Sequence, residues 1–228
     1  MRAAAAPLYV AVWTAIYAAC LLIAAMTGAV VLGKLAYAPG ERVDALYGRV
    51  QQDVRQLEAV AWPPDAPQRA VALARTLHAW IFEKSGLAQR VASVRTAEAG
   101  SLDQRLTAAA GTLAADGGES WQLAMLGTYF FGVRLICLAT LLPLLAAAYA
   151  LGFIDGLVER SIRRAGAGRE SASLYHRAKW GLAVLAIGVP TLYLAVPLDV
   201  RIGEAAPFAA LGVLLLARVQ WKYYKKYL

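Results

Sequence analysis

Basic side chains that could bind an anionic partner are crowded into one short stretch of the sequence, residues 160–179. The stretch reads RSIRRAGAGRESASLYHRAK, and the segments on both sides of it are almost entirely apolar. Guanidinium groups present forked N–H donors that match the oxygens of carboxylates and phosphates. We therefore predict a partner-binding site made of Arg160, Arg163, Arg164, Arg169, Tyr175, His176, Arg177 and Lys179.

A simpler explanation of the same charges stays open. Lysine and arginine gather at the cytoplasmic ends of membrane helices and set the orientation of a protein without binding a partner. Anionic lipid at that face would add an attraction of about 1 kcal/mol per basic residue. Direct contact with nucleic acid is a further alternative, which the sequence does not favour. The residue types alone do not separate a docking surface from a topology signal.

Residues that commonly carry catalysis or hold metals are sparse. Both cysteines lie in apolar segments, and His78 and His176 fall on opposite sides of the predicted membrane. The sequence has no HExxH zinc motif, no GxSxG nucleophile motif and no GxxxxGK[ST] phosphate loop. The Asp-Gly pair at 155–156 resembles half of an aspartyl intramembrane protease site, but the second membrane aspartate is missing. We predict a non-enzymatic protein with no cofactor and no metal.

Two charged residues border the apolar run from 135 to 154. Arg134 precedes the run and Asp155 follows it. An ionisable group inside a bilayer is costly unless it is paired or used, so both are candidate intramembrane polar sites. At the outer interface, Arg134 would reach headgroups or an acidic partner such as Glu119 or Asp116. Alternatively, it forms a bidentate pair inside the bundle.

Four apolar segments must position these residues. The composition is 60% hydrophobic and 17% charged, and the apolar residues are bunched. Segments of this kind cross a hydrocarbon core of ~30 Å with about 20 residues. The four expected crossings are Leu8–Gly33, Leu135–Ile154, Trp180–Leu198 and Ala205–Ala217. We therefore predict an all-α integral membrane protein with four transmembrane helices. A cleaved signal peptide is the alternative for the first segment, because AYA at 36–38 looks like a cleavage site.

The basic residues also predict an orientation. They are concentrated after the second crossing and in the C-terminal tail, while residues 34–124 hold ten basic and ten acidic residues. Both termini are therefore expected in the cytoplasm of a bacterial inner membrane. The predicted organisation is a first transmembrane helix in 1–33, an extracytoplasmic helical domain in 34–124, and a three-helix membrane region in 125–228 with a cytoplasmic basic hairpin at 155–179 and a basic tail at 218–228.

The extracytoplasmic segment is expected to contain two amphipathic helices. From Glu41 to Ala61, apolar residues recur at intervals of three and four, which predicts one apolar stripe. WPPDAP interrupts this pattern, and a second helix is expected from about Pro67 to Lys84, ending at Gly86. The stripes would form either the core of a helical cap or a partner-binding surface.

The C-terminal part of the chain resembles a known family. The residues that carry the resemblance are DGLVERSIRRAGAGRESASLYHRAK, the later LYLAVPLDV and the tail ending in KKYL. They are similar to membrane proteins encoded by integrating conjugative elements, a family described as a domain of unknown function. The resemblance covers about residues 128–228. It implies four membrane crossings, a role in conjugative transfer, and a gene usually close to that of the coupling ATPase, which feeds DNA to a type IV secretion channel.

Two functions follow as expectations. The first is an accessory inner-membrane component of a conjugative type IV secretion system, whose basic hairpin docks or stabilises the coupling ATPase or another secretion subunit. The second is a small membrane transporter or channel subunit. Anionic lipid is an expected partner at the cytoplasmic face, and assembly into a homo-oligomer stays open.

Overall fold

The computed structural model describes residues 5–59, 63–86, 103–166 and 172–224. Every regular element within these ranges is a helix, which confirms the all-α prediction. The elements are α1 (Ala5–Ala36), α2 (Arg42–Glu58), α3 (Ala66–His78), η1 (Ala79–Glu83), α5 (Asp103–Ala165), α6 (Ala172–Ala183), η2 (Val184–Gly188), α7 (Val189–Ala195) and α8 (Ile202–Lys222).

Four helical stretches are long and apolar enough to cross a membrane, in agreement with the four crossings predicted from the sequence. They are Tyr9–Ala36, Gly118–Ala165, Ser173–Ala195 and Ile202–Lys222. The third stretch combines α6, η2 and α7, and its π-helical turn lies just before Pro190, which has no backbone N–H to continue an α-helical pattern. These features are consistent with a multi-pass membrane protein.

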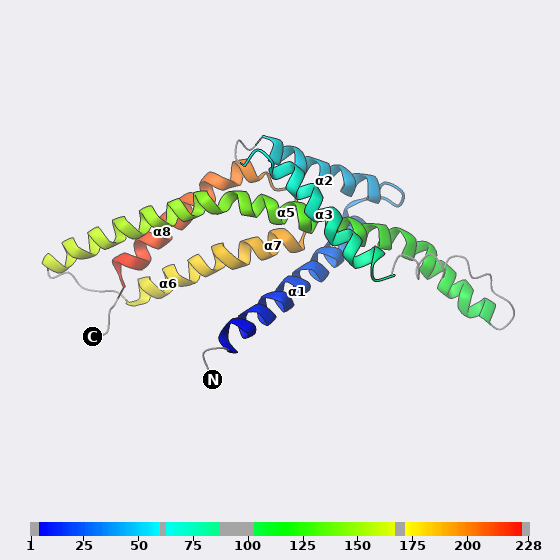
Figure 1. Cartoon of the computed structure of the whole chain (residues 1–228), viewed down its shortest axis with the longest axis horizontal. Helices are drawn as coiled ribbons and strands as arrows, with labels where there is room; N and C mark the ends of the chain where they lie inside the picture. Colours follow the sequence, from blue (N-terminus) through cyan, green and yellow to red (C-terminus); the bar gives the residue numbers. More distant parts are fainter. Residues whose placement is uncertain (1–4, 60–62, 87–102, 167–171, 225–228) are drawn as a thin grey trace.

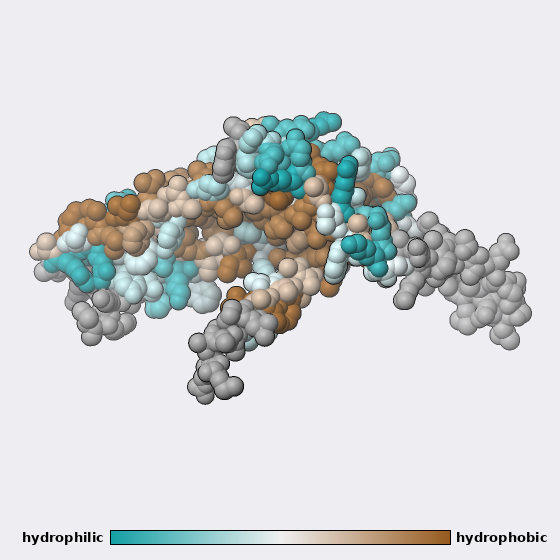
Figure 2. All heavy atoms as spheres, in the orientation of Figure 1, coloured by the Kyte–Doolittle hydropathy of each residue, from teal (hydrophilic) through white to brown (hydrophobic). Residues whose placement is uncertain are grey.

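Helix α5 is the central element of the fold and packs against α1, α2, α3 and α8 (Figure 1). It has 63 residues and continues through Pro143 and across the predicted domain boundary at residues 124 and 125. At one end of the bundle, α2 and α3 lie beside the middle of α5, near the end of α1 and the start of α8; the end of α5 and the start of α6 lie at the other end. Hydrophilic residues gather at these two ends, and hydrophobic residues lie between them (Figure 2).

The apolar stripe predicted on α2 is used for core packing. Leu46, Val50 and Leu57 are buried in one cluster with Ala70 and other residues of α3 and α5. Helix α2 stops before the prolines at 63 and 64, and the helical segment formed by α3 and η1 ends before a glycine with a positive φ of 70°, Gly86. The burial of the stripe supports the cap alternative for these two helices.

Glycine allows α5 and α8 to approach closely. A Cβ atom on Gly152 would lie 2.3 Å from the carbonyl oxygen of Leu214, and one on Gly156 would lie 2.6 Å from that of Arg218. Both distances are far below a van der Waals contact. The two glycines, spaced as GxxxG, therefore set how near the ends of these helices come to each other.

Candidate functional site

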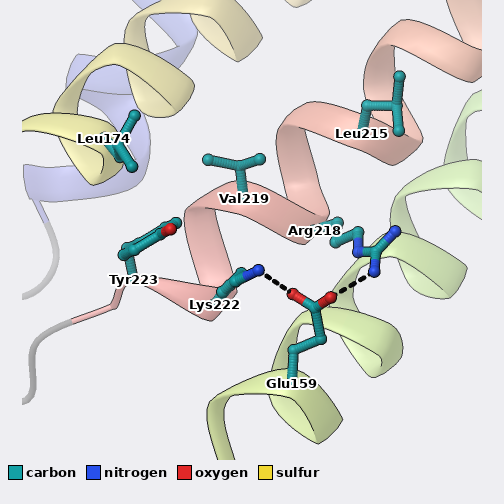
Figure 3. A pocket seen from close by; sticks show the side chains of 7 residues that line it. All are labelled: Glu159, Leu174, Leu215, Arg218, Val219, Lys222 and Tyr223. Carbon is teal, nitrogen blue, oxygen red and sulfur yellow. Dashed lines mark hydrogen bonds and ion pairs between the residues drawn. The ribbon is translucent and has the colours of Figure 1, made fainter. Parts of the chain in front are cut away.

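The end of the bundle where α5 ends, α6 begins and α8 ends is here called the basic end. Two acidic residues one turn apart on α5 face two basic residues one turn apart on α8. Arg218 Nε lies 2.8 Å from Asp155 Oδ2, and Lys222 Nζ lies 2.6 Å from Glu159 Oε2. Arg218 also donates to Glu159, so this carboxylate joins both bases (Figure 3). The charges of Arg218 and Lys222 are thus balanced within the fold.

Two arginines of α5 form a second group at the basic end. The guanidinium carbon of Arg163 lies 4.1 Å from the centre of the Tyr223 ring, and that of Arg160 lies 5.4 Å from the centre of the Tyr224 ring. Within the described ranges, neither arginine has an ion pair or a hydrogen bond through its side chain. Three of their guanidinium nitrogens are buried without an acceptor, namely Arg160 Nε, Arg160 Nη2 and Arg163 Nη1.

A third group of basic residues at this end is exposed. We call Arg164, Arg177 and Lys179 the exposed basic group. Among the residues that the structure describes, none of the three has an acidic partner. His176 is also exposed, and Tyr175 contacts the rings of His176 and Tyr224 at centroid distances of 5.3 and 5.8 Å. Arg169, the remaining predicted site residue, lies outside the described residues.

An amphipathic cleft of about 300 Å³ opens beside these groups (Figure 3). Its apolar wall comes from Leu174 of α6 and from Leu215 and Val219 of α8. Its polar side is formed by Glu159, Arg218, Lys222 and Tyr223. The cleft therefore combines an apolar surface with the edge of the basic cluster, and Tyr223 belongs to both the cleft and the contact with Arg163.

Arg134 lies far from the basic end along α5. Its buried side chain connects α5 to α2 and to the end of α7. Its side chain is 1% exposed, and its Nε donates to Asp53 Oδ2 of α2 at 2.8 Å. The other nitrogens donate to three backbone carbonyls at the end of α7 and just after it: Tyr193 (2.8 Å), Val196 (2.7 Å) and Leu198 (2.5 Å). The guanidinium also stacks against the rings of Phe130 and Tyr193.

These contacts favour a buried pair over a contact of Arg134 with headgroups. The residue forms its ion pair within the bundle, with one carboxylate oxygen rather than two. The acidic partner expected at an outer interface, Glu119, instead accepts a hydrogen bond from Arg42 at 2.9 Å. Burial raises the pKa of the Asp53 carboxyl, an effect that the Arg134 guanidinium opposes.

One face of α2 holds the segment between α7 and α8 through several contacts. Arg49 Nη1 donates to the carbonyl oxygen of Pro197 at 2.8 Å, and Gln52 Nε2 donates to Asp199 Oδ1 at 3.2 Å. Gln56 Oε1 accepts the backbone N–H of Ile202 at 3.0 Å. With Asp53, these residues recur at helical spacing on α2. The sequence analysis predicted a contact surface only on the apolar face of this helix. The polar residues at 49, 52, 53 and 56 share one side of the helix, and this spacing could have indicated the second contact surface.

No cluster of three or more metal-ligating side chains occurs among the described residues. Comparison with curated proteins and with solved structures finds no match. A family model described as IncC plasmid conjugative DNA transfer protein DtrJ-like matches residues 47–220, well over half of the chain. The match includes α2 and α3, which the resemblance noted from the sequence did not cover. It confirms a family concerned with conjugation, while the link to integrating conjugative elements and to a neighbouring ATPase gene stays a prediction. The chain belongs to the DtrJ-like family of conjugative DNA transfer proteins.

Proposed function

We propose that this protein is a non-enzymatic inner-membrane component of a conjugative type IV secretion system and that it docks the coupling ATPase. The four long apolar helices support the placement in a membrane, and family membership supports the role in DNA transfer. The asymmetry of lysine and arginine supports an orientation with both termini, and hence the basic end, in the cytoplasm. A cytoplasmic ATPase would meet the protein at this end.

The docking proposal rests on a difference among the basic residues of the basic end: some are paired with acids and others are not. Arg218 and Lys222 are neutralised by acids, whereas the exposed basic group has no acidic partner within the described part of the chain. Exposed guanidinium and ammonium groups steer an acidic protein surface and then contact it. A transporter would need a polar path, and Arg134 is a charged residue that could line one, but its side chain is bound to four acceptors in the fold.

Orientation can be checked independently with reporter fusions. A fusion at residue 100 should report the periplasm, and fusions at residue 168 and after Leu228 should report the cytoplasm, because the excess of basic residues lies on the latter side. A cytoplasmic signal at residue 100 would reverse the map and place the basic end away from the ATPase.

The docking role is tested with the triple variant Arg164→Gln, Arg177→Gln and Lys179→Gln. If each charge contributes about 0.5 kcal/mol to docking, recovery of the ATPase with the protein in mild detergent and DNA transfer should both fall roughly tenfold. Recovery from the parental protein should also decrease as salt is raised, because exposed charges are screened. Arg160, Arg163, Arg218 and Lys222 remain to maintain the orientation.

A matched control removes the same residue types from the opposite end of the molecule. Arg55, Arg75 and Lys84 are also two exposed arginines and one exposed lysine, and their replacement by glutamine should leave ATPase recovery unchanged. Parental transfer and ATPase recovery in a correctly inserted Arg164, Arg177 and Lys179 variant would reject docking and leave the charges as a topology signal.

A further inference from the structure

The inner arginines of the basic end, Arg160 and Arg163, differ from both the neutralised and the exposed basic residues. The neighbouring carboxylates, Asp155 and Glu159, are engaged by α8. Among the described residues, no other acid contacts Arg160 or Arg163. Two positive charges are therefore held one turn apart on α5, with no counter-charge among the described residues.

Their guanidinium groups also have unused hydrogen-bonding capacity. Arg160 Nε and Nη2 and Arg163 Nη1 are buried and have no acceptor in the described part of the chain. A buried N–H without an acceptor is costly, and the cost is larger for a charged group. The rings of Tyr223 and Tyr224 fix both side chains by cation–π contact, so the donors are held in place before any ligand arrives.

The surroundings favour a ligand that is part anion and part hydrocarbon. The Tyr223 ring that contacts Arg163 also lines the cleft of about 300 Å³, whose other wall is Leu174, Leu215 and Val219. On the other side of α8, Trp221 packs on Phe153 and donates to the Tyr149 hydroxyl at 3.0 Å. Tryptophan and tyrosine in such positions are typical of the interface between hydrocarbon and headgroups. The arginines lie about two and three turns beyond Phe153 on α5, toward the headgroups.

We propose that Arg160 and Arg163 bind the phosphate of one anionic phospholipid, whose acyl chain lies in the cleft lined by Leu174, Leu215 and Val219. The inference rests on the membrane placement proposed above. The phosphate oxygens supply acceptors to the forked donors, and the acyl chain covers the apolar wall. A free phosphate ion would offer the same oxygens but would leave the wall uncovered, so the cleft favours a lipid.

Native mass spectrometry of the full chain in detergent can test this site. The probe is a mixture of equal amounts of dioleoyl phosphatidylglycerol and dioleoyl phosphatidylcholine. The parental protein should retain one phosphatidylglycerol selectively. The double variant Arg160→Gln and Arg163→Gln should lose this retention at least tenfold, since the charge-assisted contacts of two arginines are removed. Leu215→Trp, which fills the cleft without changing the charge, should also lower it.

The control variant Arg164→Gln and Arg177→Gln removes the same charge from exposed positions and should keep the selective retention. Equal loss in the two double variants, or no preference of the parental protein for phosphatidylglycerol, would overturn the inference. Displacement of the lipid by millimolar inorganic phosphate would also overturn it, because the site would then be one for free phosphate. The measurement contains no ATPase, so failure of the docking proposal would not change its result.

Discussion

Arg134→Leu is expected to remove most of the folded protein from a detergent extract. The substitution leaves the Asp53 carboxyl buried without its cation and takes the donors away from three backbone carbonyls. Breaking a buried ion pair in this way costs about 3–5 kcal/mol, a large part of the 5–15 kcal/mol that typically stabilises a folded domain. Arg134→Lys keeps the charge but not the planar fork, so it should also lower the yield, by a smaller amount.

The yield of monodisperse protein and the midpoint of thermal unfolding in detergent measure this effect. Arg201→Leu is the matched control, because Arg201 pairs with Glu204 but its side chain is 66% exposed, so its loss should cost less than about 1 kcal/mol. Combining Arg134→Leu with Asp53→Leu removes the unpaired carboxyl, and the double variant should be less destabilised than the sum of the two single variants. Equal midpoints for Arg134→Leu and Arg201→Leu would contradict the buried connection.

Gly152→Ala is expected to separate α5 from α8 at the basic end. The added Cβ would lie 2.3 Å from the Leu214 carbonyl oxygen, which belongs to backbone and cannot rotate away. Overpacking commonly costs about 1–3 kcal/mol. The separation would also stretch the ion pairs of Arg218 with Asp155 and Glu159 that lie just beyond this point.

Gly212→Ala provides the control for this prediction at a position of α8 that faces η2. Its added Cβ would have its nearest neighbour at 3.7 Å, an ordinary contact with a Leu185 methyl group. Because alanine favours a helix over glycine by about 1 kcal/mol, Gly212→Ala should keep or raise the unfolding midpoint, whereas Gly152→Ala should lower it by several degrees. A midpoint for Gly152→Ala at or above the parental value would show that the helices do not depend on this close approach.

The sequence predicted the features that depend on local pattern. The apolar runs identified four long helices, and the spacing of apolar residues identified the buried face of α2. Each of these signals lies within a few residues of the element that it defines. The length of α5 was missed, because its first part, from Asp103, is rich in alanine and glycine and has a weak period.

The features that the sequence could not predict depend on contacts between distant segments. Arg134 was considered with nearby acids, but its partner is Asp53, 81 residues earlier in the chain, and its remaining acceptors are carbonyls, which every residue carries. The environments of the individual arginines at the basic end could not be predicted for the same reason. Arg160, Arg164 and Arg218 look alike as residue types, yet one lies over an aromatic ring, one is exposed and one is paired with carboxylates.

Site-specific photocrosslinking in cells that transfer DNA tests the docking of the coupling ATPase most directly. A photoreactive residue is placed at Arg164 or Arg177 of the exposed basic group, and at Tyr47, which is 53% exposed on α2, as the control for the opposite end. We expect adducts with the coupling ATPase from position 164 or 177 and none from position 47. Transfer at the parental level with no ATPase adduct at 164 or 177, or with an adduct at 47 alone, would contradict the proposed function.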